Sequence, residues 1–502
     1  MSATGPGGGT VPDIVPDVLA ARYASAEMAL LWSPRHKVVL ERRLWLAVLR
    51  AQRDLGVDVP DGVVEDYEAV VDHVDLASIE ARERVTRHDV KARIDEFCAL
   101  AGHEHVHKAM TSRDLTENVE QLQVRSALVL VRDRMVSALV RLGELAAEHA
   151  TLAVVGRTHN VAAQVTTLGK RWATAGDELL VAFDRLQDLI DRYPLRGLTG
   201  PVGTAQDQLA LLGGSPERLR ALQEAVARHL GFERSFLSTG QVYPRSLDFD
   251  AVSALVQATS APASLATTLR LMAGLDLVTE GFSAGQVGSS AMPHKMNART
   301  CERICGLAAV VGGHLAMVTA ISGHQWNEGD VSDSVVRRVA LPGAFMAVDG
   351  LYQAFLTVLD ELAPFPAVIE RDLARELPFL ATTTALVAAV RAGVGREEAH
   401  RVIKEHAVAA ALARRGAAGP PTATAAAAAA AGPSSSGGAD LFERLAGDER
   451  LRLTRADLDA IVADPLAFTG AARDQVAAFV ERTRDLAARH PEAAAYRPAP
   501  IL

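Results

Sequence analysis

Apolar residues recur every three or four positions over long stretches of this 502-residue chain. The clearest stretch runs from Thr116 to about Ala150. Its apolar positions are Leu128, Val131, Met135, Leu139, Leu142 and Leu145. This spacing predicts one long amphipathic helix. Similar patterns predict helices over roughly 160–192, 247–282, 299–322 and 334–362. Because globular helices average about 11–12 residues, these lengths favour an all-α fold built around a long bundle.

The patterning also divides the chain into predicted domains. These are a disordered extension (1–17), an N-terminal helical domain (18–115), a central long-helix domain (116–365) and a C-terminal helical domain (366–502). The extension is rich in Gly and Pro, which favours disorder. Residues 416–439 are uncharged alanine flanked by Gly, Pro and Ser, which predicts a low-complexity surface loop within the last domain.

The amino-acid composition supports a helical fold and limits the classes of partner that the protein is expected to bind. Hydrophobic residues make up 49% of the chain but aromatic residues only 5%, so Ala, Leu and Val supply the apolar surface. The chain has 52 Lys and Arg against 61 Asp and Glu, a formal net charge of −9. Nucleic-acid binders usually carry a basic excess, so the charge argues against that class of partner. A small anion remains compatible with a local basic pocket.

Cysteine content and hydropathy bear on location. The three cysteines, Cys98, Cys301 and Cys305, are too few for a disulfide framework, which favours a reducing, cytoplasmic setting. The N-terminus lacks the basic and apolar regions of a signal peptide. We find no run of about 18 uninterrupted apolar residues, so we expect no membrane-spanning helix.

One polar segment stands between two predicted helices. Residues 285–297 read GQVGSSAMPHKMN, and their glycines and proline predict a loop. The segment carries two hydroxyls, a cation and an amide: Ser289, Ser290, Lys295 and Asn297. Polar groups in a loop between rigid helices suit an active-site lid, and a solvated connector is the alternative.

Histidines and arginines give two further signals. Histidines in turn-like contexts are His88, His105, His107 and His159. Each is a candidate general acid or base, with a structural role as the alternative. His103, His105 and His107 alternate along the chain, which suggests a metal site, but no matching Cys or carboxylate cluster supports one. Scattered arginines with nearby hydroxyl groups suit the binding of phosphate or carboxylate, and surface solvation is the alternative. These residues are Arg22, Tyr23, Arg87, Arg303, Ser334 and Arg338.

A family resemblance links these signals. GSSAMPHKMN closely resembles the S-S-x-M-P-x-K-x-N loop of the fumarase/aspartase superfamily. The segments R-Y-A-S, T-R-H-D, H-x-x-x-T-S-x-D, G-R-T-H-x-x-x-A-Q and Q-x-Y-x-R resemble adenylosuccinate lyases in particular. The similarity runs from about Arg22 to the C-terminus, leaving out 416–439. It implies a three-domain, all-α subunit whose long helices form the core of a homotetramer, with each active site built from three chains.

The resemblance also implies an activity. Adenylosuccinate lyases eliminate fumarate from adenylosuccinate, giving AMP, and from the succinyl-carboxamide imidazole ribotide, in purine nucleotide biosynthesis. No metal or organic cofactor is implied. The alternatives are another fumarate-releasing lyase (argininosuccinate lyase, aspartase or fumarase) and a catalytically silent helical scaffold. Intact Ser289, Lys295 and His159 argue against the scaffold.

Roles for individual residues follow from the same resemblance. Ser289 matches the base that removes the proton next to a carboxylate, and His159 the acid that protonates the leaving nitrogen. His88 matches a residue that supports His159, and His107 one that orients the substrate. The remaining matches bind substrate: Lys295, Asn297, Thr111 and Ser112 at the carboxylates, Gln241 near the succinyl group, and Arg22, Tyr23, Arg87, Asp89, Arg303, Ser334 and Arg338 at the nucleotide.

The chain departs from the family pattern in places. Gly329 stands where many members carry a phosphate-binding arginine, which puts phosphate binding at that position in doubt. The other departures are Ala109, Asn160, Val165, Met296 and Ala298. None removes a group that does chemistry, so they indicate a divergent subfamily.

Overall fold

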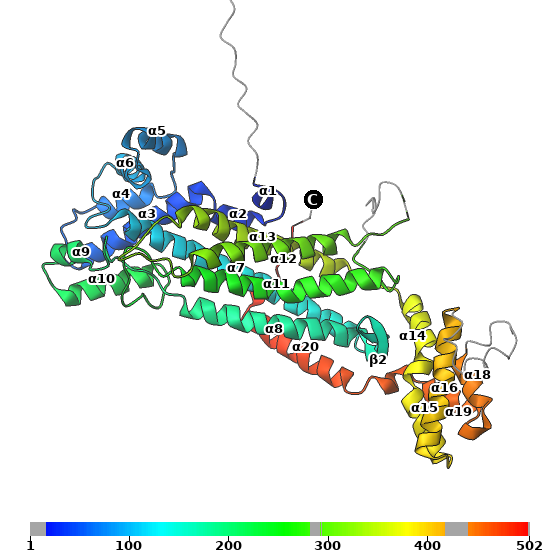
Figure 1. The fold of residues 1–502 in the computed structure, drawn as a ribbon. Coiled ribbons are helices and arrows are strands. Elements are labelled where there is room, and N and C mark those ends of the chain that lie inside the picture. The colour runs from blue at the N-terminus through cyan, green and yellow to red at the C-terminus, as the bar shows by residue number, and fades with distance from the viewer. Residues whose placement is uncertain (1–16, 282–291, 293, 417–439, 500–502) are drawn as a thin grey trace, which may run out of the picture.

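A computed structural model describes residues 17–281, 292, 294–416 and 440–499. In this part of the chain, long helices lie side by side in an elongated bundle (Figure 1). They are α7 (Ser112–Glu148), α8 (Leu168–Arg192), α11 (Ser246–Ala273), α12 (Arg299–Ile321) and α13 (Ser334–Glu361). The predicted all-α bundle is confirmed. The predicted extension except residue 17, most of the predicted loop 285–297 and nearly all of 416–439 lie outside the described residues.

The bundle core forms along the predicted apolar face of α7. Leu128, Val131 and Met135 are fully buried there, and each contributes roughly 1.5–3 kcal/mol to folding. Helix α20 (Ala472–Arg489) returns from the C-terminal part and packs on α7 and α8. The approach is close, because a Cβ added to Gly143 would lie 2.2 Å from the Thr483 hydroxyl oxygen. Any larger residue at that position would push α20 off the bundle.

A β-hairpin follows α7, where the sequence predicted the start of a helix. Strands β1 (Ala153–Thr158) and β2 (Val161–Thr167) pair antiparallel, and α8 begins only at Leu168. The predicted helix over 160–192 was therefore wrong before Leu168. The physical reason is the concentration of β-branched Val and Thr in both strands, which favours extended backbone.

The helix predicted over 247–282 also ends early. α11 stops at Ala273, and Gly274 caps it. The short strand β3 (Val278–Thr279) then pairs with β4 (Ala363–Pro364), which directly follows α13. The chain on either side of the predicted loop is thus held at the end of the bundle away from the N-terminal helices (Figure 1).

Shorter helices form the N-terminal end of the molecule. They are α3 (Pro34–Asp54), α4 (Val63–Ala69), α5 (Leu76–Thr86) and α6 (Asp89–Ala101). Two later helices, α9 (Gln206–Leu211) and α10 (Pro216–His229), join the same core, where Trp45, Tyr67 and Phe97 are buried. The first two helices, α1 (Val18–Arg22) and α2 (Ala26–Leu31), pack on the bundle instead, against α13 and α7.

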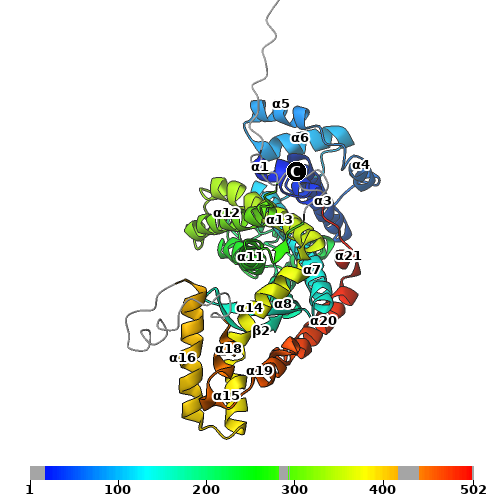
Figure 2. The ribbon, with the colours of Figure 1, turned by 90° about the vertical axis from the view of Figure 1, so that its right-hand side faces the viewer.

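A second helical group lies at the other end of the bundle (Figure 1), and Figure 2 shows it from that end. It contains α14 (Pro366–Leu380), α15 (Thr382–Arg391), α16 (Arg396–Arg414), α18 (Leu441–Ala446), the 3₁₀ helix η2 (Glu449–Leu451), α19 (Arg455–Val462) and the 3₁₀ helix η3 (Pro465–Phe468). The last helix, α21 (Pro491–Ala494), lies back against α7. The domain boundaries stay predictions. Two helices pack outside their predicted domains: α10, from the predicted central domain, packs on α3, and α20, from the predicted C-terminal domain, packs on α7.

Two described helices, α12 and α13, are long and apolar enough to span a membrane by length and composition alone. The bent pair α14 and α15 would add a third span if it were one unit. Within this chain 89% of the apolar window of α13 is buried, but only 28% of that of α12. The apolar surface of α13 is therefore covered by the bundle, whereas much of the surface of α12 is open.

Candidate functional site

The start of α7 presents the first predicted substrate-binding pair. Thr111 is the N-cap of α7, and its backbone N–H donates to Asp114 Oδ2 at 2.9 Å. The Thr111 side chain faces the backbone N–H of Asp114 in turn, so the two residues form a capping box that fixes the start of the helix. Ser112 follows as the first residue of the helix.

His107 lies just before this helix start, and a tryptophan holds its ring. The indole N–H of Trp45 donates to His107 Nδ1 at 3.0 Å. Burial lowers the pKa of His107 to about 4, with Asp114 acting in the opposite direction and His88 adding to the lowering. At neutral pH the ring is therefore uncharged. Because Nδ1 accepts, the ring proton is on Nε2.

His88 approaches the same place from the start of α6. It is the N-cap of that helix, and its Nδ1 accepts from the backbone N–H of Lys91 at 3.3 Å. The adjacent Asp89 is bound by Arg93, which also pairs with the buried Glu41. Arg87 precedes His88 in a left-handed conformation, with φ of 51°, and is exposed. α6 and the segment around His107 pack into the same apolar core, so the two histidines lie at one end of the molecule.

The alternating His103 and His105 each lie against another side chain. His103 Nε2 lies 2.7 Å from Asp66 Oδ2, and His105 Nδ1 lies 2.8 Å from Lys108 Nζ. Among the described residues, no group of three or more His, Cys, Asp or Glu side chains is arranged to hold a metal ion.

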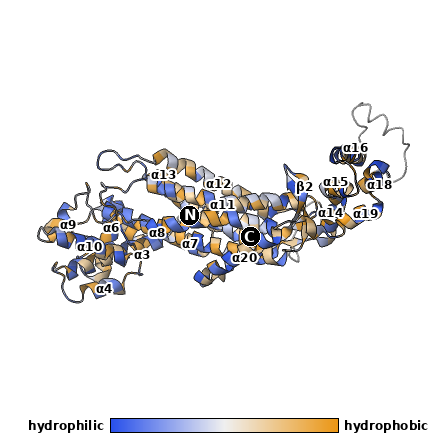
Figure 3. Cartoon of the chain, turned by 90° about the horizontal axis from the view of Figure 1, so that it is seen from below, coloured by the Kyte–Doolittle hydropathy of each residue, from blue (hydrophilic) through white to orange (hydrophobic). Residues whose placement is uncertain are grey.

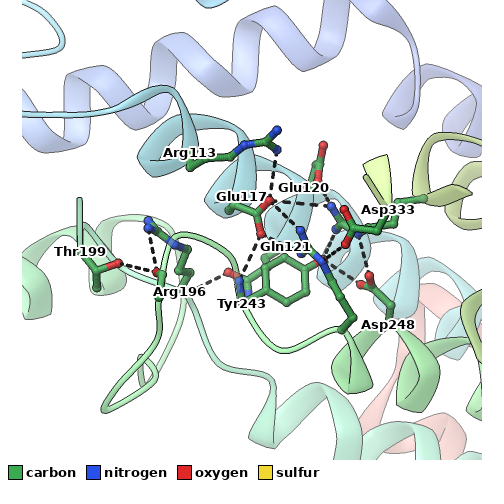
Figure 4. Close-up of polar contacts among 12 residues, drawn as sticks. Arg113, Glu117, Glu120, Gln121, Arg196, Thr199, Tyr243, Asp248 and Asp333 are labelled. Atoms are coloured by element: carbon green, nitrogen blue, oxygen red, sulfur yellow. Dashed lines mark hydrogen bonds and ion pairs between the residues drawn. The ribbon is translucent and has the colours of Figure 1, made fainter. Parts of the chain in front are cut away.

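A buried network of charged groups underlies this end of the bundle (Figure 4). Arg245 donates to both carboxylate oxygens of Glu117, at 2.8 and 3.1 Å, and to Asp333. All three side chains are at most 5% exposed. Arg245 lies four residues after Gln241, and Asp333 directly precedes Ser334. The network therefore ties two predicted substrate-binding positions to α7, which carries Ser112.

A second arginine extends the network. Arg337 donates to Asp248 at 2.7 Å, to Glu120 at 2.6 Å and to the Tyr243 hydroxyl. The carboxylates around it raise the pKa of Arg337 well above its usual range, although burial opposes this. Arg337 thus stays charged and cross-links α7, α11 and α13. The neighbouring Arg338, by contrast, is exposed.

A third buried pair, outside these contacts, fixes the first turn of α7. Arg196 donates to Asp114 Oδ1 at 2.7 Å and to the carbonyl oxygen of Gly240 at 3.2 Å. Both charged side chains are fully buried. Through Gly240 the pair also positions the adjacent Gln241.

The backbone explains why glycine stands at position 329. Gly329 has a φ of 152°, and a Cβ there would lie 2.8 Å from the Cβ of Gln241. The neighbouring Gln241 N–H donates to the carbonyl oxygen of Glu328 at 2.5 Å. This close contact leaves no room for a side chain, so an arginine at this position is incompatible with the present backbone.

We therefore expect Gly329→Arg to lower activity by displacing Gln241, and not to improve phosphate binding. Gly329→Ala is the matched variant, because it adds only the Cβ. Both should raise KM for the substrate by a similar factor, measured by steady-state kinetics. A KM for Gly329→Arg below that of the unsubstituted protein would contradict the steric explanation.

Arg22, Tyr23 and Arg303 form a second group along the bundle. The Arg303 guanidinium lies 5.6 Å from the centre of the Tyr23 ring, a cation–π distance. Tyr23 packs on α13 near Gly350, where an added Cβ would lie 2.7 Å from the Tyr23 Cβ. Arg338 lies roughly 18 Å from Gly350 along α13. A single chain therefore does not bring Arg338 to this group.

His159 lies in a third place, at the tip of the β1–β2 hairpin. His159 and Asn160 both have positive φ values, 51° and 60°, and Thr158 pairs with Val161. This is the geometry of a two-residue type I′ turn, in which asparagine is favoured. The departure at Asn160 is thus compatible with the turn. Both carboxylate oxygens of Asp372 on α14 accept from Arg157 at 2.9 Å, which anchors the hairpin.

Lys295 and Asn297 lie just before α12. Lys295 is exposed and its backbone N–H donates to the carbonyl oxygen of Met292 at 3.0 Å. The carboxylate of Glu280 accepts from the N–H groups of Thr300 and Cys301, at 2.9 and 2.8 Å, and so caps α12. Ser289 and Ser290 lie outside the described residues.

These groups are too far apart to form one site within a chain. The 37-residue α7 separates Thr111 from the hairpin that carries His159, a length of about 55 Å. Figure 1 shows β2 beside α14, at the opposite end from α6. Three surface cavities of ≈ 520, 610 and 640 Å³ are lined entirely by residues other than the predicted site residues. The geometry of one chain therefore supplies separate parts of a site.

Sequence reasoning missed the residues that position these groups. Tyr243 and Arg245 stood inside the Q-x-Y-x-R segment but received no role. Glu117, Asp333 and Trp45 received no role, because Arg245, which binds the first two, and His107, which binds the third, lie far away in the chain. A charged residue on the apolar face of a predicted helix was the available hint for Glu117.

Two family models match the chain. The lyase model matches residues 36–313, and the adenylosuccinate lyase C-terminus model matches residues 378–479. The adenylosuccinate lyase of Saccharomyces cerevisiae is 34% identical over 473 residues, covering 92% of this chain and 93% of that protein. The adenylosuccinate lyase of Schizosaccharomyces pombe is 32% identical, with the same coverage of both proteins.

Solved structures show the same fold. The 3-carboxy-cis,cis-muconate lactonizing enzyme of Pseudomonas putida aligns with a TM-score of 0.78 at 22% identity, covering 94% of this chain and all of that chain. A fumarate lyase of Mesorhizobium aligns with a TM-score of 0.74 at 20% identity, covering 92% and 98%. At these identities the likeness concerns the fold alone. The sequence matches to adenylosuccinate lyases, at 34% and 32% identity over 92% of the chain, show that this chain belongs to the adenylosuccinate lyase family.

Proposed function

We propose that this chain is an adenylosuccinate lyase, which eliminates fumarate from adenylosuccinate to give AMP and from the succinyl-carboxamide imidazole ribotide in purine nucleotide biosynthesis. The observation that carries the proposal is similarity to adenylosuccinate lyases over 92% of the chain, at 34% identity in one case. The retained Ser289, Lys295 and His159 support it.

In the proposed reaction Ser289 removes a proton from the carbon next to a carboxylate of the succinyl group. The electron pair forms the double bond of fumarate as the carbon–nitrogen bond breaks, and His159 protonates the leaving nitrogen. A positioned acid of this kind contributes about 10²–10⁴ in rate. The exposed hairpin tip supports this role, because it holds the His159 ring outside its own chain.

Negative charge builds up on the substrate carboxylate during the reaction. Lys295, Asn297, Thr111 and Ser112 are proposed to bind it, and preorganised donors of this type are worth roughly 10²–10³ in rate each. The capping box that fixes Thr111 at the start of α7 supports its part in this binding. Arg22, Tyr23 and Arg303, which lie together, are proposed to bind the nucleotide with Arg87, Asp89, Ser334 and Arg338.

We also propose that the chain acts as a homotetramer in the cytoplasm. Support for assembly comes from α12, whose exposed residues are mostly small or apolar (Figure 3). Gly306, Gly312 and Gly313 have open space where a Cβ would stand. A surface of this kind suits close packing against helices of other chains, which would also bring the separated parts of the site together.

The test is the ultraviolet absorbance of adenylosuccinate incubated with the purified protein. We expect a time-dependent change that matches formation of AMP and fumarate. Argininosuccinate, aspartate and malate serve as controls for the other fumarate-releasing lyases. Preference for any of these three would overturn the proposal, and no turnover of all four would favour the silent scaffold.

A further inference from the structure

We propose that Trp45 is a positioning residue that fixes the tautomer of His107, so that His107 presents an Nε2–H donor to the substrate. This inference rests on the proposed function, because it takes His107 as a residue that orients the substrate. Trp45 itself lies outside any predicted substrate contact and acts only through the imidazole.

The direction of one hydrogen bond determines the tautomer. The Trp45 Nε1 atom lies 3.0 Å from His107 Nδ1. An indole N–H donates and never accepts, so Nδ1 must be the acceptor. A neutral imidazole carries one proton, which is therefore placed on Nε2.

The indole is itself held rigidly. Trp45 is 1% exposed and stacks on Phe97, with ring centres 6.0 Å apart and an angle of 21°. Phe97 is fixed in turn by Tyr67, at 4.7 Å, and by the Arg42 guanidinium, at 4.7 Å from the ring centre. The indole has no room to turn, and its N–H direction is set by the core of the N-terminal helices.

The contact is specific among the buried tryptophans. Trp172 is also fully buried and lies edge-on to a histidine, His149, with ring centres 6.5 Å apart. The indole nitrogen of Trp172, however, has no hydrogen-bond partner among the described residues. The chain thus offers a natural control with the same ring types and no hydrogen bond.

The groups that face His107 favour the neutral ring. Burial lowers the pKa of His107 to about 4, and His88 at the start of α6 adds to this. Asp114 on α7 acts in the opposite direction, but its carboxylate is already bound by Arg196 and Thr111. His107 therefore remains uncharged at physiological pH, where the tautomer matters.

Loss of the indole N–H has a consequence that depends on pH. Without that donor Nδ1 is free, and the neutral ring can carry its proton on either nitrogen. In the tautomer that is protonated on Nδ1, the lone pair of Nε2 faces the anionic substrate, and the hydrogen bond to the substrate is lost. Protonation gives both nitrogens a proton and restores the donor, and it becomes easier because no N–H competes for Nδ1.

The experiment compares kcat/KM against pH for the full-length protein and for Trp45→Phe and Trp172→Phe. For Trp45→Phe we expect a loss of about 3- to 10-fold at pH 7, the effect of one neutral hydrogen bond, which shrinks only as the pH approaches the His107 pKa of about 4. Trp172→Phe should keep the pH profile of the unsubstituted protein. A loss in Trp45→Phe that is equal at all pH values, or no loss, would overturn the inference.

A measurement on the unsubstituted protein does not depend on how the variant folds. Solid-state ¹⁵N spectra of histidine-labelled protein, with His107 assigned by subtraction of the His107→Gln spectrum, report which ring nitrogen carries the proton. We expect an unprotonated Nδ1 and a protonated Nε2 at pH 7. A protonated Nδ1 would overturn the inference even if the protein is active. If the unsubstituted protein does not convert adenylosuccinate, the proposed function fails, whatever this spectrum shows.

Discussion

Mixing two inactive variants, His88→Gln and His159→Gln, is expected to restore about one quarter of the unsubstituted activity. The two residues lie at opposite ends of the 37-residue α7, so one chain does not bring them to one substrate. In the proposed tetramer, a site takes each from a different chain. With equal amounts of both variants, about one site in four then receives both intact residues.

Each variant alone should be nearly inactive. Removal of a positioned acid or base lowers the rate by about 10²–10⁴, so even partial recovery is easy to detect. The measurement is turnover of adenylosuccinate after the two chains are co-expressed and purified together.

The matched control pairs His88→Gln with His107→Gln. Both residues belong to the same end of one chain, and the His88 charge affects the pKa of His107. Every site assembled from these two variants therefore has one defect, and no activity should return. Recovery in neither mixture, or equal recovery in both, would contradict sites shared between chains.

Replacing Arg245 by methionine should cost about 3–5 kcal/mol of stability, because it breaks the buried ion pairs of Arg245 with Glu117 and Asp333. Glu117 is fully buried and accepts two hydrogen bonds from Arg245, at 2.8 and 3.1 Å. Asp333 is buried as well and loses its partner at the same time. We expect a large drop in the thermal unfolding midpoint, measured at fixed protein concentration because assembly affects it.

Activity should fall with stability in this variant. Arg245 connects the backbone near Gln241 with the segment that leads into Ser334, so both substrate-binding positions should lose their relative placement. A rise in KM at a temperature where the variant is folded would report this. Arg192→Met is the control, since Arg192 forms its ion pair with Asp250 at the surface. Surface pairs contribute about 0–1 kcal/mol, and equal shifts in both variants would contradict the expectation.

The sequence predicted those elements whose signals are local. α12 and α13 have nearly the predicted bounds, because a single period of apolar residues runs through each. The second strand of the hairpin, just after His159, was mistaken for helix, since a seven-residue strand leaves only a short alternating pattern. Its turn was nevertheless recognisable as a polar, turn-like context.

In the candidate site, too, the residues with local signals were predicted and those with distant partners were not. The histidines and the loop residues stood out because they lie in compact motifs. Arg245 lies 128 positions from Glu117, and His107 lies 62 positions from Trp45, and a single sequence does not show that such distant residues are paired. The separation of the site residues into distant groups was equally invisible, because it depends on the length and direction of α7 in space.

The distance between Thr111 and His159 also affects how activity begins in the cell. On the proposed assembly, a newly synthesised chain folds with all its chemical groups and still has no working site. Turnover starts only after chains meet, so specific activity rises with protein concentration until assembly is complete. A low concentration of the protein therefore slows the reaction by limiting assembly, without any inhibitor.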